Sequence, residues 1–347
     1  AKGTATETSD LDLFYIPDGG DALAPLASVV VDGLPYDFWP VSWQMAEEIA
    51  DARSPRPWAV AASLVADARM LFARSDEDRS RFEGLQRRVR ELTEPGSRRT
   101  MVQRAITAFP HVTAALGQMR RAAEQGDEAG IGWAGRKAVE GCLNCLALAN
   151  QTYFSKGWGA NFAEAGALAK RPPDLIELIE RVLLPSDDAG PVGAAEQLAA
   201  GVRIMLQEER DATSVPAAAA EVFRDFYHYV HEYVAKVGAA CERGDVLAAG
   251  YAAAMLEEQV AQLLHLCGAG YLPTEFDLAG EYRAEYLGAG LPRLHELAAA
   301  GDLAALAAAV RAFDRRMRDW LTHRDIDLRV FDGADELRAF LRARYRD

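Results

Sequence analysis

The most informative segment of this chain is Thr8-Ser9-Asp10-Leu11-Asp12-Leu13-Phe14. Its apolar residues alternate with Asp10 and Asp12, a pattern that is typical of a β-strand. Successive side chains of a strand point to opposite faces, so these two carboxylates, two positions apart, project from the same face. Carboxylate oxygens are the ligands that hard divalent cations prefer. The segment therefore predicts a metal site on one face of a strand.

A β-hairpin is expected shortly after this segment. Val29-Val30-Val31 is followed by Asp32-Gly33, a typical tight-turn pair, and then by a second strand from Leu34 to Val41. The second strand carries Asp37 between large aromatic side chains. Acidic residues rarely lie among such neighbours unless they have a partner. Asp37 is therefore the expected third carboxylate.

Small residues precede the first acidic pair, in the run Ala1-Lys2-Gly3-Thr4-Ala5-Thr6. A run of this kind lets the backbone approach a phosphate group closely. Together with the carboxylates, it indicates nucleotide chemistry.

Lys2-Gly3-Thr4-Ala5, Ser9 to Leu13 and the later Asp37 resemble the nucleotidyltransferase superfamily. That superfamily includes DNA polymerase β and the antibiotic nucleotidyltransferases that act on aminoglycosides and lincosamides. In the family a Gly-Ser pair ends one strand and the Asp-x-Asp pair begins the next. Ala1 lies about where the Gly-Ser pair would already have occurred, so we expect the first strand and its turn to be missing from this sequence.

The resemblance implies a magnesium-dependent enzyme with ATP as co-substrate. Asp10, Asp12 and Asp37 would be both the catalytic residues and the metal ligands, with Asp37 completing the second metal site or accepting the acceptor's proton. The nucleotide's phosphates would be contacted by Thr4, Thr6 and Ser9.

Beyond Glu94-Pro95-Gly96-Ser97, a cluster of helix-breaking residues, alanine and leucine recur at helical spacing. Within this part Ala122-Ala123-Glu124-Gln125-Gly126-Asp127 recurs as Ala240-Cys241-Glu242-Arg243-Gly244-Asp245. The pattern predicts two tandem helical bundles. The expected fold class is thus α+β, with a small mixed-sheet nucleotidyltransferase domain (residues 1–95, N-terminally incomplete), a first bundle on the side of the substrate cleft (100–214) and a second, degenerate bundle (215–347).

Further site residues come from comparing the two copies and from the family resemblance. Lys156 is charged where the second copy has the uncharged Thr274, and the segment Tyr153 to Trp158 resembles a tyrosine-to-lysine-tryptophan segment in the helical domain of aminoglycoside-type enzymes. The resemblance implies that Lys156 reaches the triphosphate, with Tyr153 beside it. Glu140 is a candidate substrate anchor or base, although a packing role explains it equally well. Trp39 is a candidate acceptor contact at the junction of the first domain and the first bundle.

Composition restricts the partners. The 347 residues are 50% hydrophobic and carry a formal net charge of −14, which argues against general nucleic-acid binding and favours a small cationic acceptor. The sequence has no apolar run long enough for a membrane span and no apolar leader, so a cytoplasmic protein without membrane contact is expected.

Cys142 and Cys145 form a C-x-x-C pair inside a helical pattern and are expected to be buried thiols, not a metal site.

The leading functional hypothesis is transfer of a nucleoside monophosphate, most simply AMP from ATP, to a hydroxyl of a small acceptor such as an aminoglycoside-like antibiotic. One alternative is a minimal nucleotidyltransferase of the toxin–antitoxin type that modifies a protein. Another is an inert nucleotide-sensing or interaction protein. A homodimer is compatible with each of them.

Overall fold

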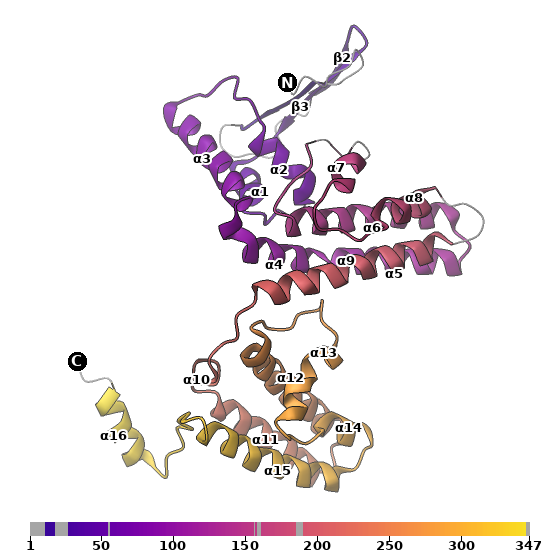
Figure 1. The fold of residues 1–347 in the computed structure, drawn as a ribbon. Helices are drawn as coiled ribbons and strands as arrows, with labels where there is room; N and C mark the ends of the chain where they lie inside the picture. Colours follow the sequence, from indigo (N-terminus) through magenta and orange to yellow (C-terminus); the bar gives the residue numbers. More distant parts are fainter. Residues whose placement is uncertain are drawn as a thin grey trace. The chain divides into compact units, whose positions relative to one another are not determined.

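The computed structural model describes residues 11–17, 27–54, 56–155, 157, 161–184 and 190–344. The chain forms two compact units, Ala1–Thr213 and Ser214–Asp347 (Figure 1). Unit 1 contains a small sheet and the helices that line the candidate site, and the regular elements described in unit 2 are all helices.

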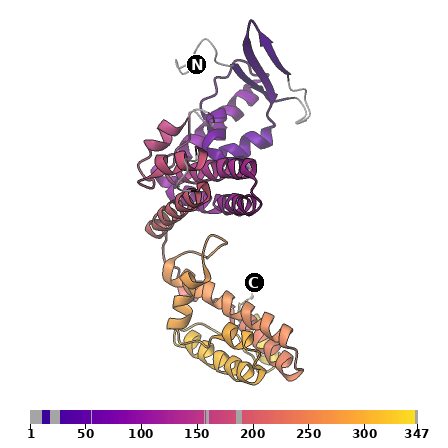
Figure 2. The same ribbon diagram turned by 90° about the vertical axis from the view of Figure 1, so that its right-hand side faces the viewer.

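The sheet of unit 1 consists of β1 (Leu11–Tyr15), β2 (Ala27–Val31) and β3 (Leu34–Pro40), drawn as arrows in Figure 2. The strand order is β1-β3-β2, with β3 parallel to β1 and antiparallel to β2. Asp32 and Gly33 join β2 to β3 with φ values of 53° and 80°. Positive φ at both central positions is what a type I′ hairpin turn requires. The predicted hairpin and the mixed sheet are confirmed.

The next helices are α1 (Trp43–Ala50), α2 (Trp58–Ala66) and α3 (Asp76–Leu92). Ser42 caps α1 by accepting a hydrogen bond from the Met45 amide at 3.0 Å, and Ser75 caps α3 by accepting one from the Asp78 amide at 3.1 Å. These hydrogen bonds satisfy amide groups that have no partner within the helix. A serine directly before a helical pattern, as at Ser42 and Ser75, predicts a helix start at each position, and both starts are confirmed.

The sequence also indicates a strand at Ala68–Ala73, and this prediction is wrong. Residues 68–73 have neither helical nor strand structure, and the side chains of Leu71 and Phe72 are 72% and 81% exposed. A run of apolar residues becomes a strand only if a neighbouring strand accepts its backbone hydrogen bonds. None of the described strands pairs with this segment.

The rest of unit 1 is helical. Its elements are the 3-10 helix η2 (Pro95–Ser97), α4 (Arg98–Ala108), α5 (Pro110–Glu124), α6 (Glu128–Ala149), α7 (Phe162–Gly166), α8 (Leu175–Leu183) and α9 (Pro191–Thr213). Helix α6 contacts α2, α4, α5, α8 and α9, and its C-terminal half is almost wholly buried. It is therefore the central helix of unit 1 and joins the bundle to the helices beside the sheet.

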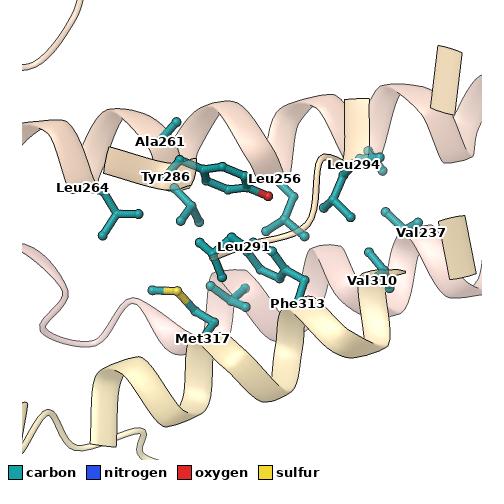
Figure 3. Packing of buried hydrophobic residues seen from close by; sticks show 14 of the residues in the cluster. Val237, Leu256, Ala261, Leu264, Tyr286, Leu291, Leu294, Val310, Phe313 and Met317 are labelled. Atoms are coloured by element: carbon teal, nitrogen blue, oxygen red, sulfur yellow. The ribbon is translucent and has the colours of Figure 1, made fainter. Parts of the chain in front are cut away.

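Unit 2 is built around α12. Its elements are α10 (Ala219–Val222), α11 (Tyr227–Glu242), α12 (Val246–Ala269), α13 (Ala279–Gly288), α14 (Leu294–Ala299), α15 (Leu303–Thr322) and α16 (Ala334–Arg344). Helix α12 packs against α10, α11, α13, α14 and α15. Figure 3 shows Tyr286, Phe313 and Met317 in the core, where the first two rings stack at a centroid distance of 6.3 Å. This unit has its own hydrophobic core.

The central helices of the two units begin in the same way. Gly126 and Gly244 have φ values of 68° and 70°, and each is followed by an aspartate that caps the next helix. Asp127 accepts a hydrogen bond from the Gly130 amide at 2.9 Å, and Asp245 accepts one from the Ala248 amide at 3.0 Å. The sequence offset from residue 127 to residue 245 thus relates two turns of the same geometry. The wider division into two tandem bundles stays a prediction.

Gly270 ends α12 with φ +85°, and an added Cβ would lie 2.4 Å from the backbone of Val215. We expect Gly270→Ala to destabilise unit 2 by more than 2 kcal/mol, because the left-handed backbone costs a non-glycine residue about 1–2 kcal/mol before any clash is counted. Gly244→Ala is the matched control, since Gly244 also has positive φ but no atom within 4 Å of an added Cβ. Urea unfolding of both variants checks this, and equal losses of stability would show that the contact with Val215 has no effect.

Cys142 and Cys145 are both buried, as predicted. Burial raises the pKa of the Cys145 thiol to about 12 and that of Cys142 well above its usual range. The Cys145 thiol points to the Ala105 carbonyl oxygen at 3.4 Å. Thiols of this kind pack as small apolar groups and do not react at neutral pH.

None of the helices in the described part of the chain has the length and apolar character that a membrane crossing requires.

Candidate functional site

Two of the three predicted carboxylates lie on neighbouring strands. Asp12 of β1 is directly opposite Asp37 of β3 in the parallel register. Neighbouring strands are ~4.8 Å apart, and directly opposite residues present their side chains on the same face of the sheet. Asp12 is exposed and Asp37 is half-buried. The sheet therefore brings together two acids that are 25 positions apart in the chain, from residue 12 to residue 37.

Asp10, the third predicted ligand, lies outside the described residues. In the described ranges, no group of three or more histidine, cysteine, aspartate or glutamate side chains is placed to hold a metal ion. Asp12 and Asp37 supply hard oxygen ligands, which fit Mg²⁺. The candidate metal site thus rests on this pair.

The Asp12 side chain borders a cavity of about 540 Å³. One wall is the edge strand β1 with the residues that follow it, and the other is the irregular segment 68–74 with α3. Cavities of this size accept small molecules. The segment that the sequence misassigned as a strand is therefore one side of the candidate site.

Aromatic side chains form the floor of this region. Phe14 lies on the same face as Asp12 and packs against Phe82 of α3, with ring centroids 6.0 Å apart. Trp39 is opposite Phe14 in the register, with a centroid distance of 6.2 Å. Phe14 and Phe82 line the cavity and Trp39 does not. Trp39 accordingly supports the wall of the cavity through Phe14.

Sequence reasoning did not find three charged residues that line the same cavity, Arg69, Arg74 and Asp78. Arg74 donates hydrogen bonds from Nε and Nη2 to the Asp78 carboxylate, both at 3.1 Å. Arg69 adds a second cation to a cavity that also contains Asp12. These residues line the cavity because segment 68–74 lies beside β1 and α3, and the sequence contains no signal for that placement.

Tyr153 lies where the bundle meets the helices beside the sheet. Its hydroxyl donates a hydrogen bond to Asp67 at 2.9 Å, and its ring packs edge-on against Trp58. Burial, together with the hydrogen bond to Asp67, raises the pKa of Tyr153 to about 12. Asp67 directly precedes the segment that borders the Asp12 cavity, but Tyr153 does not line that cavity. The structure thus shows Tyr153 as a link between the bundle and this segment.

Glu140 belongs to a different cavity, of about 600 Å³, between the α1–α2 connection and helices α4, α5 and α6. Its carboxylate forms an ion pair with Arg136 one turn earlier in α6. The other charged residues and the histidine that line this cavity are Arg53, Arg56, Arg104, His111 and Lys137. The two cavities share no lining residue, so the structure does not bring Glu140 to Asp12.

The remaining predicted residues, Thr4, Thr6, Ser9, Asp10 and Lys156, lie outside the described part of the chain. Their proposed contacts with phosphate groups or metal stay predictions.

Residues 79–213 match the KNTase C-terminal domain. The KNTase C-terminal domain is that of kanamycin nucleotidyltransferase, so the match supports the nucleotidyltransferase family of the aminoglycoside type and points to an enzyme. The matched residues begin within α3 and end at Thr213, the residue at which unit 1 also ends. Unit 2 lies outside the match. No curated protein and no solved structure matches the chain significantly.

Proposed function

We propose that this protein transfers a nucleoside monophosphate, most simply AMP from ATP, to a hydroxyl group of a small acceptor and releases pyrophosphate. The observation that carries the proposal is the pairing of Asp12 with Asp37 across β1 and β3, in a chain whose next helices match the KNTase C-terminal domain. Two carboxylates on one face of a sheet, of which Asp12 lines a cavity of about 540 Å³, would supply the acidic part of a transferase site.

In this proposal Asp12 and Asp37 hold Mg²⁺, with Asp10 as the expected third ligand. The bound ion would neutralise charge on the phosphate groups and make the acceptor hydroxyl more acidic. Asp37, half-buried on the central strand and outside the lining of that cavity, would complete the second metal site or accept the proton of that hydroxyl. Arg69, in the same cavity as Asp12, is available to contact an anionic oxygen of the nucleotide.

The acceptor is expected to lie in the Asp12 cavity, between β1 and segment 68–74. Phe14 and Phe82 provide the apolar surface on which a sugar-like ring packs. Acceptor hydroxyls must approach the α-phosphate in line, so a positioned and partly dry cavity is what this chemistry requires.

The experiment that tests the proposal is incubation with radiolabelled ATP or GTP, Mg²⁺ and a panel of aminoglycosides, lincosamides and simple amino-sugars. We expect label to appear on one class of acceptor, with one pyrophosphate released for each acceptor modified. If calorimetry shows that the nucleotide binds but no acceptor or protein is labelled, the inert sensing role is favoured. Label on a protein partner instead of a small molecule would favour the protein-modifying alternative.

A further inference from the structure

The 600 Å³ cavity that Glu140 lines contains cations that lack a counterion. Arg56, from the connection between α1 and α2, forms no side-chain hydrogen bond or ion pair in the described structure. The same is true of Arg104 on α4 and Lys137 on α6, as far as the described residues show. The Nε atom of Arg104 is buried and has no hydrogen-bond partner among the described residues. Three cations from three separate segments thus converge on one cavity.

The other charges of this cavity are already paired. Arg53 forms an ion pair with Asp51 at 2.5 Å, and Glu140 pairs with Arg136. The chain as a whole has a net charge of −14, so acidic residues are abundant, yet among the described residues Glu140 is the one carboxylate that lines this cavity, and its ion pair is with Arg136. Cations brought together without counterions repel one another, and a bound anion relieves this cost.

The corresponding helix of unit 2 supports a specific role for one of these cations. Lys137 is ten residues after the capping Asp127, and the residue ten positions after the capping Asp245 is Met255. The two helices share their capped start, so a lysine is not needed there for the helix or its turn.

We propose that this cavity binds a small molecule with two or more phosphate groups, at a site separate from the Asp12–Asp37 pair. Guanidinium groups bind phosphate oxygens through two parallel hydrogen bonds, and lysine adds a point charge, so Arg56, Arg104 and Lys137 suit a diphosphate or triphosphate. His111 and the side-chain amide of Gln118 line the same cavity and supply further donors. The remaining wall includes Leu148, which leaves room for an apolar part of the ligand.

The test is calorimetric titration of the full chain with inorganic tripolyphosphate, without divalent cations. We expect binding to one site that weakens as salt is added. The double variant Arg56→Ala/Lys137→Ala should bind at least ~10-fold more weakly, since it removes two charge-assisted contacts. Arg56 and Lys137 are exposed, so their removal should leave the fold intact.

The matched control is Arg99→Ala/Arg121→Ala. These residues are exposed on α4 and α5, lie outside the cavity and change the net charge by the same amount. The control should bind tripolyphosphate as the parent protein does. No detectable binding, or equal weakening in both double variants, would overturn the proposal.

Two further arms separate this site from the proposed transferase site and identify the ligand. Asp12→Asn should leave tripolyphosphate binding unchanged, and a loss of binding in that variant would place the anion at the acidic pair and overturn the proposal. Failure of the transfer reaction would not affect the result, because the titration contains neither metal nor acceptor.

ATP that binds more tightly than tripolyphosphate would assign the cavity to nucleotides, and equal binding would assign it to the phosphate chain alone.

Discussion

Asp12→Asn is expected to lower the rate of nucleotide transfer by about three orders of magnitude, which corresponds to about 4 kcal/mol of transition-state stabilisation. The substitution keeps the shape of the side chain and removes the charge that the proposed metal site requires. Asp12 is exposed on an edge strand, so the sheet should tolerate the amide. The measurement is single-turnover transfer of labelled nucleotide, with circular dichroism to verify the fold.

Asp32→Asn is the matched control for this variant. Asp32 lies in the same sheet region, at the β2–β3 turn, and has φ 53°, a conformation that asparagine also adopts readily. It removes one negative charge without touching the acidic pair, so activity should stay within about twofold of the parent. Equal activity of Asp12→Asn and Asp32→Asn would end the metal-site hypothesis.

Asp37→Asn combined with Asp12→Asn should lower the transfer rate little more than either substitution alone, because ligands of one site act together.

Glu257→Ala is expected to destabilise unit 2 by about 3–5 kcal/mol. Glu257 is 3% exposed on α12, forms an ion pair with Arg283 at 2.5 Å and accepts a hydrogen bond from the His295 amide at 2.8 Å. Its removal leaves the His295 backbone amide without its acceptor, and Arg283 keeps only the longer ion pair with Glu296, at 3.5 Å. Urea unfolding followed by hydrogen exchange on peptides of unit 2 measures the loss.

Glu258→Ala provides the comparison on the next residue of the same helix. Glu258 is exposed, and its carboxylate accepts only a long hydrogen bond, 3.3 Å, from Gln262 among the contacts that the structure describes. Its removal should change stability by less than about 0.5 kcal/mol. Similar losses of stability in the two variants would show that the burial of Glu257 does not explain the destabilisation.

Local sequence signals located many of the elements correctly. Ser42 and Ser75 marked helix starts because their hydroxyl groups satisfy amides that the helix itself leaves unpaired. Asp32-Gly33 marked the hairpin because both residues tolerate positive φ. The match of residues 79–213 to the KNTase C-terminal domain supports the nucleotidyltransferase family that the acidic motif had suggested.

Signals of the same kind failed at residues 68–73, where the apolar pattern of a strand was present and no neighbouring strand was. Local sequence signals also could not indicate that Asp12 and Glu140 line two different cavities. The sequence suggested Glu140 as a substrate anchor or base, or as a packing residue, and its side chain lines the cavity that contains Arg56, Arg104 and Lys137, where it forms an ion pair with Arg136.

The sequence by itself determined what depends on neighbours within a few residues: the caps, the hairpin turn, the alternation that puts Asp12 on one face of β1, and the mainly helical character of the described residues after Pro95. Only the tertiary structure decided that Asp12 faces Asp37, that segment 68–74 closes one cavity, and that Arg56, Arg104 and Lys137 meet in another. The physical reason is that turns and caps are set by local backbone geometry and hydrogen bonds. Which charged side chains line the same cavity depends, in contrast, on how distant segments pack, and no local pattern specifies that.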